Sequence, residues 1–481
     1  MGFLKRIFKH SGAEKAKKRR KHRGLATAFA IAVVAFPGAC VEAQVPQAPL
    51  TQNASGLSDN QLLDITQRQT LNYFTGFAHP VSGMARERTN NIETYGVDVV
   101  ATGGTGFGIM AIIAGTSHGW LPRDEAFDRI EKIVDFLSTT ADRYNGLFPH
   151  FLDGTTGKTY AMMNPADDGS DVVESAFLFQ GLLTAREYFN GADPKETALR
   201  AKINTLWEAA DWTAHVKPGG RELIWNHSPN HAFKIDLPVR GWNEGLIAYV
   251  VAASSPTHPI SREVFEHGWN HDGRIVRNKT EEGYKLQLGG GPLFFTQYSF
   301  LGLDPRELKD GDIDYGAQAR NQALADHAYA VRNPRRRKGY GPAWGLTASD
   351  GPEGYQVGSP QEDEGVIAPT AALSSFPYTP EYSMLALRHY YEDYNGKLWG
   401  KYGFVDAFDE GRDWQASTSL ALDEGPIVVM IENHRTGLLW NLFMGAPEIQ
   451  QGLRKLGLDS PHLHESSPLP PRTPPAPPKP N

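Results

Sequence analysis

The stretch Pro238-Val-Arg-Gly-Trp-Asn-Glu-Gly245 leads directly into the apolar run 246–253. An apolar run of this length predicts a buried helix, and Glu244 then lies at its N-terminal end beside Arg240 and Trp242. Burial raises the pKa of a carboxyl group, whereas a cation or a helix N-terminus lowers it. A carboxyl group between these influences can donate a proton near neutral pH. The alternative is that Glu244 only complements the positive end of a helix dipole.

Helical periodicity dominates the rest of the chain. Ser58 and Gln61 form a predicted capping box, and a small β-hairpin with a tight turn is expected over 147–154. Strands and helices do not alternate, so the pattern favours an all-α toroid or barrel over a parallel sheet. The glycine-rich segments 103–106, 289–291 and 400–403 are interpreted as joints between helices. The expected helices cover 58–77, 122–137, 171–190, 196–216, 243–254, 315–331, 380–394 and 446–456.

The N-terminal residues 1–43 are typical of a targeting segment, because a basic stretch precedes a short apolar run. The sequence around Ala43 fits a cleavage site for export, and Cys40 lies where a bacterial lipoprotein would carry its lipid anchor. We expect export to the periplasm, with a membrane-anchored lipoprotein as the alternative. Residues 44–56 are predicted to be a linker, 57–457 one catalytic domain, and 458–481 a disordered, proline-rich tail.

The charge balance restricts the partners. The chain has 48 Lys and Arg against 55 Asp and Glu, and residues 1–43 hold ten of the basic and two of the acidic residues, so the mature body has a net charge of −15. A strongly acidic body argues against nucleic acid or anionic lipid as a partner, whereas neutral sugars are compatible with it. Without residues 1–43 no span of the membrane is expected. Cys40 is the only cysteine, so no disulfide is expected.

A second group of acidic residues lies in the segment 166–174. Asp167, Asp171 and Glu174 are four and three residues apart and would share one helical face. Three like charges on one face repel each other unless a sugar hydroxyl, a proton or a cation occupies the space between them. The structural alternative is that Asp171 and Glu174 only cap the helix that follows.

A third group, Asp423 and Glu424, stands just before another apolar helix. Glycoside hydrolysis needs two carboxyl groups on either side of one bond, and Asp423 is the natural partner for Glu244. We expect the two to converge across a single cleft lined by helix ends.

Metal-binding patterns are weak. The acidic alternation over 310–314 resembles the start of a calcium loop, but the glycine at the sixth position is missing and Asn321 replaces the final Glu. No zinc motif occurs on any predicted helix. We therefore predict neither a metal nor a cofactor.

The ordered motifs together resemble the glycoamylase-like family, glycoside hydrolase family 144, over residues 57–456. That resemblance implies an (α/α)6 barrel and hydrolysis of β-1,2-glucan with inversion at the anomeric carbon. The motifs are Arg240-Gly-Trp-Asn-Glu-Gly-Leu246, Ser255-Pro-Thr-His-Pro259, Gly290-Gly-Pro-Leu-Phe-Phe-Thr-Gln-Tyr298, Trp344-Gly-Leu-Thr-Ala-Ser-Asp350, Ile367-Ala-Pro-Thr-Ala-Ala372 and Met430-Ile-Glu-Asn-His-Arg-Thr-Gly437.

The resemblance carries functional carboxylates onto Asp167, Asp171, Glu174 and Glu244. Asp423 matches the family's Asp-Gln-Gly-Pro element, although Glu424 replaces the Gln and adds a charge beside the expected base. Glu244 is then the general acid and Asp423 the general base, directly or through a hydroxyl relay. Asp171 and Glu174 would hold the sugar at the cleavage point, and Asp171 is a rival for the base.

Sugar binding is expected from a second set of side chains. Flat aromatic rings in loops can stack on sugars, although most Trp residues in any chain belong to the core. The predicted set is Asp167, Arg240, Trp242, Trp344 and His150.

Two rival functions remain. A glycan-binding protein could keep the same groove without turnover. A polysaccharide lyase on a similar toroid would need basic groups for an acidic sugar, which the acidic body disfavours.

Overall fold

The structure is a computed structural model that describes residues 56–162 and 164–463. The predicted targeting segment, nearly all of the predicted linker, Cys40 and residues 464–481 of the predicted tail lie outside this part. The tail was predicted to begin at 458, but Leu458–Asp459 form strand β15, which pairs with β7. The ordered body therefore extends slightly beyond the predicted boundary.

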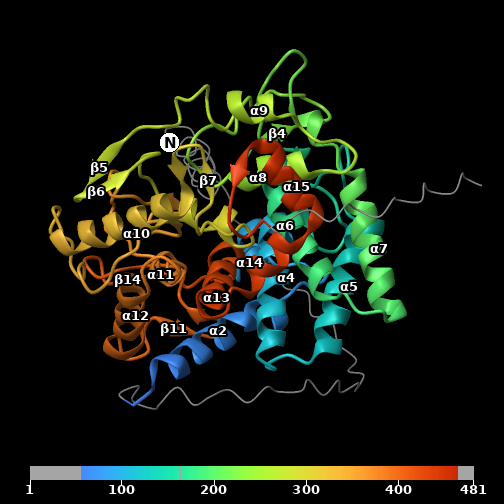
Figure 1. Ribbon diagram of the computed structural model, residues 1–481. Coiled ribbons are helices and arrows are strands. Elements are labelled where there is room, and N and C mark those ends of the chain that lie inside the picture. The colour runs from blue at the N-terminus through green and yellow to red at the C-terminus, as the bar shows by residue number, and fades with distance from the viewer. Residues whose placement is uncertain (1–55, 163, 464–481) are drawn as a thin grey trace, which may run out of the picture.

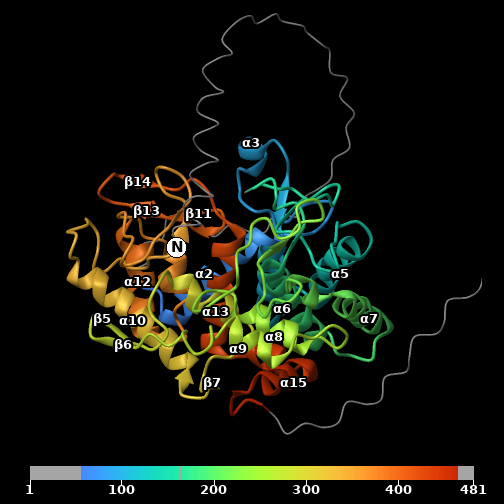
Figure 2. The ribbon, with the colours of Figure 1, turned by 90° about the horizontal axis from the view of Figure 1, so that it is seen from above.

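Six inner segments form a closed ring at the centre of the molecule (Figures 1 and 2). Helix α4 packs against α6 and α13, α6 packs against α8, and α11 packs against α13. The 3₁₀ turns η2 and η3 close the ring, because η3 contacts α8 and Gln297 Nε2 donates to Ala371 O of α11 at 2.9 Å. The inner segments are α4 (Thr102–Ser117), α6 (Val172–Tyr188), α8 (Leu246–Ser254), η2 (Leu293–Thr296) with η3 (Tyr298–Phe300), α11 (Pro369–Leu373) and α13 (Ala421–Arg435).

An outer layer of helices surrounds the ring. In Figure 2, α5 and α7 lie on one side of α6 and α13, and α10 and α12 lie on the other. The (α/α)6 barrel is thereby confirmed. The outer and connecting helices are α2 (Asp59–Thr75), α3 (Asn91–Tyr95), α5 (Arg123–Thr139), α7 (Pro194–Ala209), η1 (Trp212–His215), α9 (Arg262–His267), α10 (Tyr315–Arg332), α12 (Pro380–Arg388), the π-helical turn His389–Asp393, α14 (Leu438–Gly445) and α15 (Pro447–Leu456).

The strands form small antiparallel ladders in the connections. The predicted hairpin near Asp153 exists, since Leu152 bridges Thr159, but β2 has its longer pairing with β1. The paired strands are β1 (Val99–Ala101) with β2 (Phe151–Asp153), β3 (Ser170–Asp171) with β4 (Asn226–His227), β5 (Lys279–Glu281) with β6 (Tyr284–Leu286), β7 (Lys309–Asp310) with β8 (Ile313–Asp314) and β15, β9 (Ala348–Ser349) with β10 (Gln356–Val357), β11 (Trp399–Gly400) with β12 (Gly403–Phe404), and β13 (Phe408–Asp409) with β14 (Trp414–Gln415).

The interpretation of 103–106 as a joint is wrong. These glycines form the first turns of α4, where the backbones of α4 and α6 touch. A Cβ on Gly106 would lie 2.1 Å from Phe177 O, and one on Gly181 would lie 2.3 Å from Gly106 O. Glycine is therefore required by close packing of two inner helices and not by a turn.

The helix predicted over 196–216 is also shorter than expected. Helix α7 ends at Ala209, and the chain then forms the separate 3₁₀ turn η1, which Asp211 caps through the N–H of Thr213. The predicted capping box of Ser58 and Gln61 at the start of α2 is confirmed.

Candidate active site

The N-terminal ends of the inner helices carry the predicted carboxylates. Asp171 caps α6 by accepting the N–H groups of Val173 at 2.9 Å and Glu174 at 3.0 Å. Glu174 in turn accepts the N–H of Gly103, at the start of α4, at 2.7 Å. Helix N-termini favour negative charge, so the barrel gathers its acids where the backbone stabilises them. Asp171 therefore caps α6, as the structural alternative expected. The capping hydrogen bonds also hold the carboxylate in place, so they are compatible with a role in chemistry.

Asp423 and Glu244 lie at the N-terminal ends of two further inner helices. Asp423 is in the first turn of α13, and Glu244 lies just before α8. The N-terminus of α8 has no side-chain cap, so Glu244 does not serve as a hydrogen-bonding cap there. Its main-chain oxygen instead accepts a hydrogen bond from Ser299 Oγ of η3.

His150 lies between the acids of α6. Its Nδ1 is 3.2 Å from Asp171 Oδ2, and its Nε2 is 3.5 Å from Glu174 Oε1. Burial lowers the pKa of His150, but the charges of Glu174 and Asp171 outweigh burial and raise the pKa to about 10. The imidazolium supplies the cation that three like charges in this segment require.

The remaining acid of this group, Asp167, lies in the loop before β3. Asn226 Nδ2 donates to Asp167 Oδ1 at 2.6 Å, and Trp225 Nε1 donates to Asp171 Oδ2 at 3.1 Å. Burial raises the pKa of Asp167 to about 6. Burial also raises the pKa of Glu174 to about 7, against the opposing effect of His150. We call His150, Asp167, Asp171 and Glu174 the histidine cluster.

Glu244 keeps part of its side chain exposed although protein surrounds most of it. Burial, followed by the charges of Glu174 and Asp171, raises its pKa to about 7. A group with this pKa holds a proton in a large fraction of molecules at neutral pH, as an acid catalyst must. Arg240, expected beside it, instead pairs with Glu222, whose Oε2 lies 2.9 Å from Arg240 Nε.

Asp423 lies against a second carboxyl group, Asp406, which the motifs did not indicate. Both side chains are 3% exposed. Asp406 Oδ2 accepts the N–H of Asp350 at 2.6 Å, and the hydrogen bond between the two carboxyl groups requires a shared proton. Burial and Asp406 raise the pKa of Asp423 well above its usual range, and burial and Asp350 raise that of Asp406 to about 7. Two touching carboxylates cannot both ionise in a buried site.

Glu424 adds a third buried acid to this pair. It is 2% exposed, and burial raises its pKa well above the usual range of a glutamate. We call Asp406, Asp423 and Glu424 the aspartate cluster. Burial therefore disfavours the extra charge expected from Glu424.

Arg88 is a cation whose charge affects the aspartate cluster. Arg88 pairs with Glu87 at 2.8 Å and with Asp350 at 3.0 Å, and its charge lowers the pKa of Asp406. Asp350 ends a motif that the sequence singled out, whereas Arg88 had no such signal.

One tyrosine connects the two predicted catalytic partners. Burial, then Asp423, and also Glu244 raise the pKa of Tyr298 well above the usual range. Both carboxylates therefore lie within electrostatic range of a single phenol. The structure brings Glu244 and Asp423 to the same end of the barrel, around Tyr298.

The predicted aromatic platforms differ in position. Trp242 is partly buried, stacks beside Tyr315 with ring centroids 6.3 Å apart, and donates from Nε1 to Gln322 Oε1 at 2.7 Å. Trp344 is only 1% exposed and packs against His327. Sugar stacking does not fit Trp344, because neither face of the indole is accessible.

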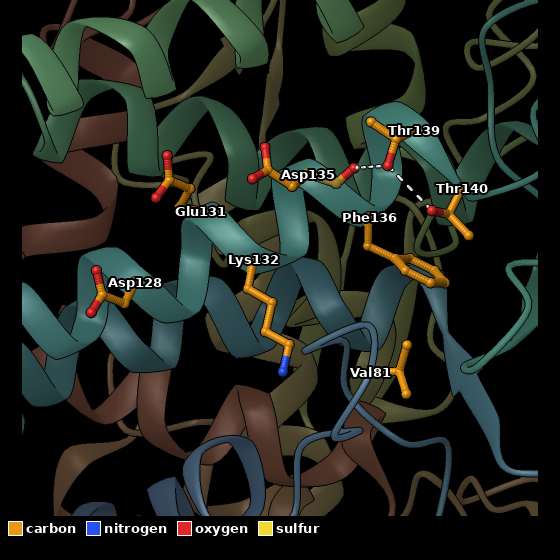
Figure 3. A pocket seen from close by; sticks show the side chains of 8 residues that line it. All are labelled: Val81, Asp128, Glu131, Lys132, Asp135, Phe136, Thr139 and Thr140. Carbon is orange, nitrogen blue, oxygen red and sulfur yellow. Dashed lines mark hydrogen bonds between the residues drawn. The ribbon is translucent and has the colours of Figure 1, made fainter.

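A solvent-open groove elsewhere on the surface is not this site. It runs along the outer helix α5, has a volume of about 500 Å³, and contains none of the predicted site residues (Figure 3). Its lining residues are Val81, Asp128, Glu131, Lys132, Asp135, Phe136, Thr139 and Thr140.

The segment 310–314 forms the hairpin of β7 and β8. Asp314 caps α10 through the N–H of Ala317 at 2.9 Å, and Asn270 Nδ2 donates to Asp310 Oδ2 at 2.9 Å. Within residues 56–162 and 164–463, no group of three or more His, Cys, Asp and Glu side chains could hold a metal ion. Two of the acids that resembled a calcium loop, Asp310 and Asp314, thus have structural partners.

Comparison with known proteins gives independent evidence about this chain. A family model described as "Putative glucoamylase" matches residues 236–447. An endo-β-1,2-glucanase of Chitinophaga pinensis, solved with sophorotriose and glucose, is 46% identical, with a TM-score of 0.82 over 85% of this chain and 100% of that one. The chain belongs to the glycoamylase-like family.

A curated relative is similar over much of the sequence as well. The exo-β-1,2-glucooligosaccharide sophorohydrolase of Parabacteroides distasonis is 43% identical over 83% of this chain, and the match spans 58% of that protein's length. An endo-β-1,2-glucanase of Talaromyces funiculosus is 14% identical with a TM-score of 0.58, which shows a shared fold.

None of the helices within the described residues is long and apolar enough to span a membrane.

Proposed function

We propose that this protein is a glycosidase that hydrolyses β-1,2-glucan or its oligosaccharides with inversion at the anomeric carbon. The observation that carries the proposal is Glu244, a carboxyl group with a pKa of about 7 at the same end of the barrel as Asp423. The relatives from Chitinophaga pinensis and Parabacteroides distasonis, named for action on β-1,2-linked glucose, support the choice of substrate.

In the proposed reaction, a water molecule adds to the anomeric carbon while the bond to the leaving oxygen breaks. Glu244 gives its proton to that oxygen, and Asp423 takes a proton from the water, directly or through a hydroxyl group. The pair of Asp423 and Asp406 suits this task, because two carboxyl groups that share one proton retain one negative charge. Asp171 and Glu174, fixed by His150, would bind hydroxyl groups of the sugar at the cleavage point.

Product analysis tests the proposal. The purified protein should release short oligosaccharides from linear β-1,2-glucan and nothing from β-1,3- or α-1,4-glucan. Polarimetry or NMR should show the inverted anomer as the first product. The variant Glu244→Gln keeps the shape of the side chain but has no proton to give, so we expect kcat to fall by about 10²–10⁴-fold.

Other outcomes point to the rival functions. Calorimetric binding of β-1,2-glucan without any product would indicate a glycan-binding protein. Ultraviolet absorbance from an unsaturated product would indicate a lyase. Full activity of Glu244→Gln would remove Glu244 as the acid.

We also propose export to the periplasm, since the basic and apolar segment before Cys40 and Ala43 is typical of secreted bacterial proteins. Fractionation of cells that produce the full chain should recover it from the periplasm or from the membrane. Release of a membrane-bound form by Cys40→Ala would identify a lipid anchor. Recovery only from the cytoplasm would refute export.

A further inference from the structure

Tyr298 ends the motif 290–298, and its hydroxyl group lacks the main-chain partner that four other buried tyrosines have. Tyr73, Tyr249, Tyr378 and Tyr390 each donate from Oη to a main-chain oxygen at 2.6–2.8 Å. Tyr298 is 5% exposed, yet its Oη makes no hydrogen bond to any residue within the described ranges. A buried hydroxyl usually has a partner.

The unpaired oxygen is open to solvent. Enclosed polar atoms without a partner do occur in this protein, for example Trp207 Nε1 and Trp212 Nε1, but Tyr298 Oη is not one of them. Its ring is buried while its hydroxyl group can reach an external ligand. The position is that of a donor presented to a molecule which the protein binds.

Three phenylalanines from different inner segments hold the ring. The ring centroids of Phe107 of α4 and Phe294 of η2 are each 5.2 Å from that of Tyr298, and the ring of Phe177 of α6 packs edge-on at 5.8 Å. A ring enclosed from three sides has little freedom to rotate out of place. The direction of the hydroxyl group is therefore set by packing alone.

The main chain around Tyr298 is connected to Glu244, the residue proposed as the acid. Gln180 Nε2 of α6 donates to Tyr298 O at 3.2 Å. The next residue, Ser299, donates from Oγ to Glu244 O and accepts the N–H of Ile247 at 3.1 Å. The start of η3 and the residue proposed as acid are thus fixed to each other.

The ring of Tyr298 is also connected, through Phe107, to the helix that carries Asp423, the residue proposed as the base. Phe107, which packs on it, lies so close to α13 that a Cβ on Gly425 would be 2.5 Å from Phe107 Cβ. Gly425 comes two residues after Asp423. Burial and the charges of Asp423 and Glu244 raise the pKa of Tyr298, so the phenol keeps its proton at any working pH and can donate it in a hydrogen bond.

We propose that Tyr298 Oη binds the reacting oxygen between Glu244 and Asp423, either a sugar hydroxyl group or the attacking water. This inference rests on the proposed function and names a further residue of the same site. A hydrogen bond at this position orients the nucleophile against Asp423 and strengthens as charge develops in the transition state.

The variant Tyr298→Phe tests the proposal, because it removes only an oxygen that has no partner in the protein. We expect kcat/KM on β-1,2-glucooligosaccharides to fall by about 10- to 100-fold, as for the loss of one hydrogen bond in a transition state. The melting temperature should not decrease. A loss in kcat at constant KM would indicate contact with the water, whereas a rise in KM as well would indicate contact with a sugar hydroxyl.

Tyr378→Phe is the matched control, since Tyr378 donates to Thr296 O at 2.7 Å in the adjacent turn. It should lower the melting temperature and leave kcat/KM unchanged. Wild-type kcat/KM in Tyr298→Phe would overturn the proposal, as would an equal loss of activity in both variants. If the wild-type protein itself releases no product from β-1,2-glucan, the proposed function fails, and unchanged affinity of Tyr298→Phe for the glucan in calorimetry would then refute the role of Tyr298 separately.

Discussion

The histidine cluster and the aspartate cluster occupy the same end of the same barrel, yet they balance their charge in different ways. In the histidine cluster, the His150 imidazolium contacts Asp171 and Glu174 at 3.2 and 3.5 Å. In the aspartate cluster, Asp423 contacts another carboxyl group, and Arg88 forms its ion pair with Asp350 instead. A cation therefore balances charge in the histidine cluster, whereas burial and mutual repulsion favour the protonated form in the aspartate cluster.

The difference matches two separate tasks in the proposed reaction. Carboxylates held beside a cation are fixed in position and can accept hydrogen bonds from a substrate. Carboxyl groups that share a proton exchange it readily, because small changes in their surroundings shift the balance between them. The helix N-termini allow both arrangements, so the neighbouring side chains decide which one forms.

The largest expected effect comes from the aspartate cluster. Replacing Asp423 with Asn removes the proton acceptor, so we expect kcat to fall by about 10²–10⁴-fold. Single-turnover assays on a β-1,2-glucooligosaccharide measure this loss. Glu424→Gln is the matched control, because Gln keeps the shape of a neighbouring side chain whose charge burial disfavours. Equal losses in both variants would contradict the distinction between these neighbours.

The histidine cluster should respond in stability. His150→Gln leaves Asp171 and Glu174 without a cation, and we expect the free energy of unfolding to fall by about 3 kcal/mol at pH 7. The folded pKa of about 10 exceeds the unfolded value of about 6.5, so the contribution of His150 is complete below pH 6.5 and is lost as the pH rises through 10. Urea titrations at pH 7 and pH 10 measure the loss of stability and its dependence on pH, with the exposed His258→Gln as control. An unchanged unfolding midpoint at pH 7 would show that the cation is not needed.

The smallest effect concerns Glu244, whose pKa is raised by the charges of Glu174 and Asp171 in the histidine cluster. Its pKa is about 7, so kcat/KM should fall by about tenfold for each pH unit above 7 as the acid loses its proton. Glu174→Gln removes a charge that raises this pKa and should move the fall to lower pH. Rates measured from pH 5 to 10 test both statements. A profile that stays flat to pH 9 would exclude Glu244 as the group that titrates.

Sequence periodicity predicted two outer helices closely and missed the inner helix α4. Helices α5 and α10 each have one buried face, so their apolar residues recur at helical spacing, and both were predicted close to their observed bounds. Helix α4 is buried from Thr102 to Gly115, so it has no periodic pattern, and its glycines suggested a joint. Burial on all sides removes the periodic signal, and the glycines of α4 then gave a misleading one.

The candidate site shows a similar division. Four of the site carboxyl groups stand before or at the start of apolar helices, and this position can be recognised in the sequence. They are those of Glu244, Asp171, Glu174 and Asp423. Asp406 and Arg88 lie in loops without a motif and reach the site only through the tertiary fold. Trp344 had the sequence context of a binding residue and proved to be core, because loop composition does not indicate which face of a ring is covered.

The sequence by itself determined the helical class, the family and the residues that carry negative charge at helix ends. These follow from local patterns and from motifs, both of which are read along the chain. The tertiary structure alone decided which acids touch His150, which touch each other, and that Tyr298 is near both proposed partners. Protonation and hydrogen bonding depend on distances between residues that are far apart in sequence, and packing sets those distances.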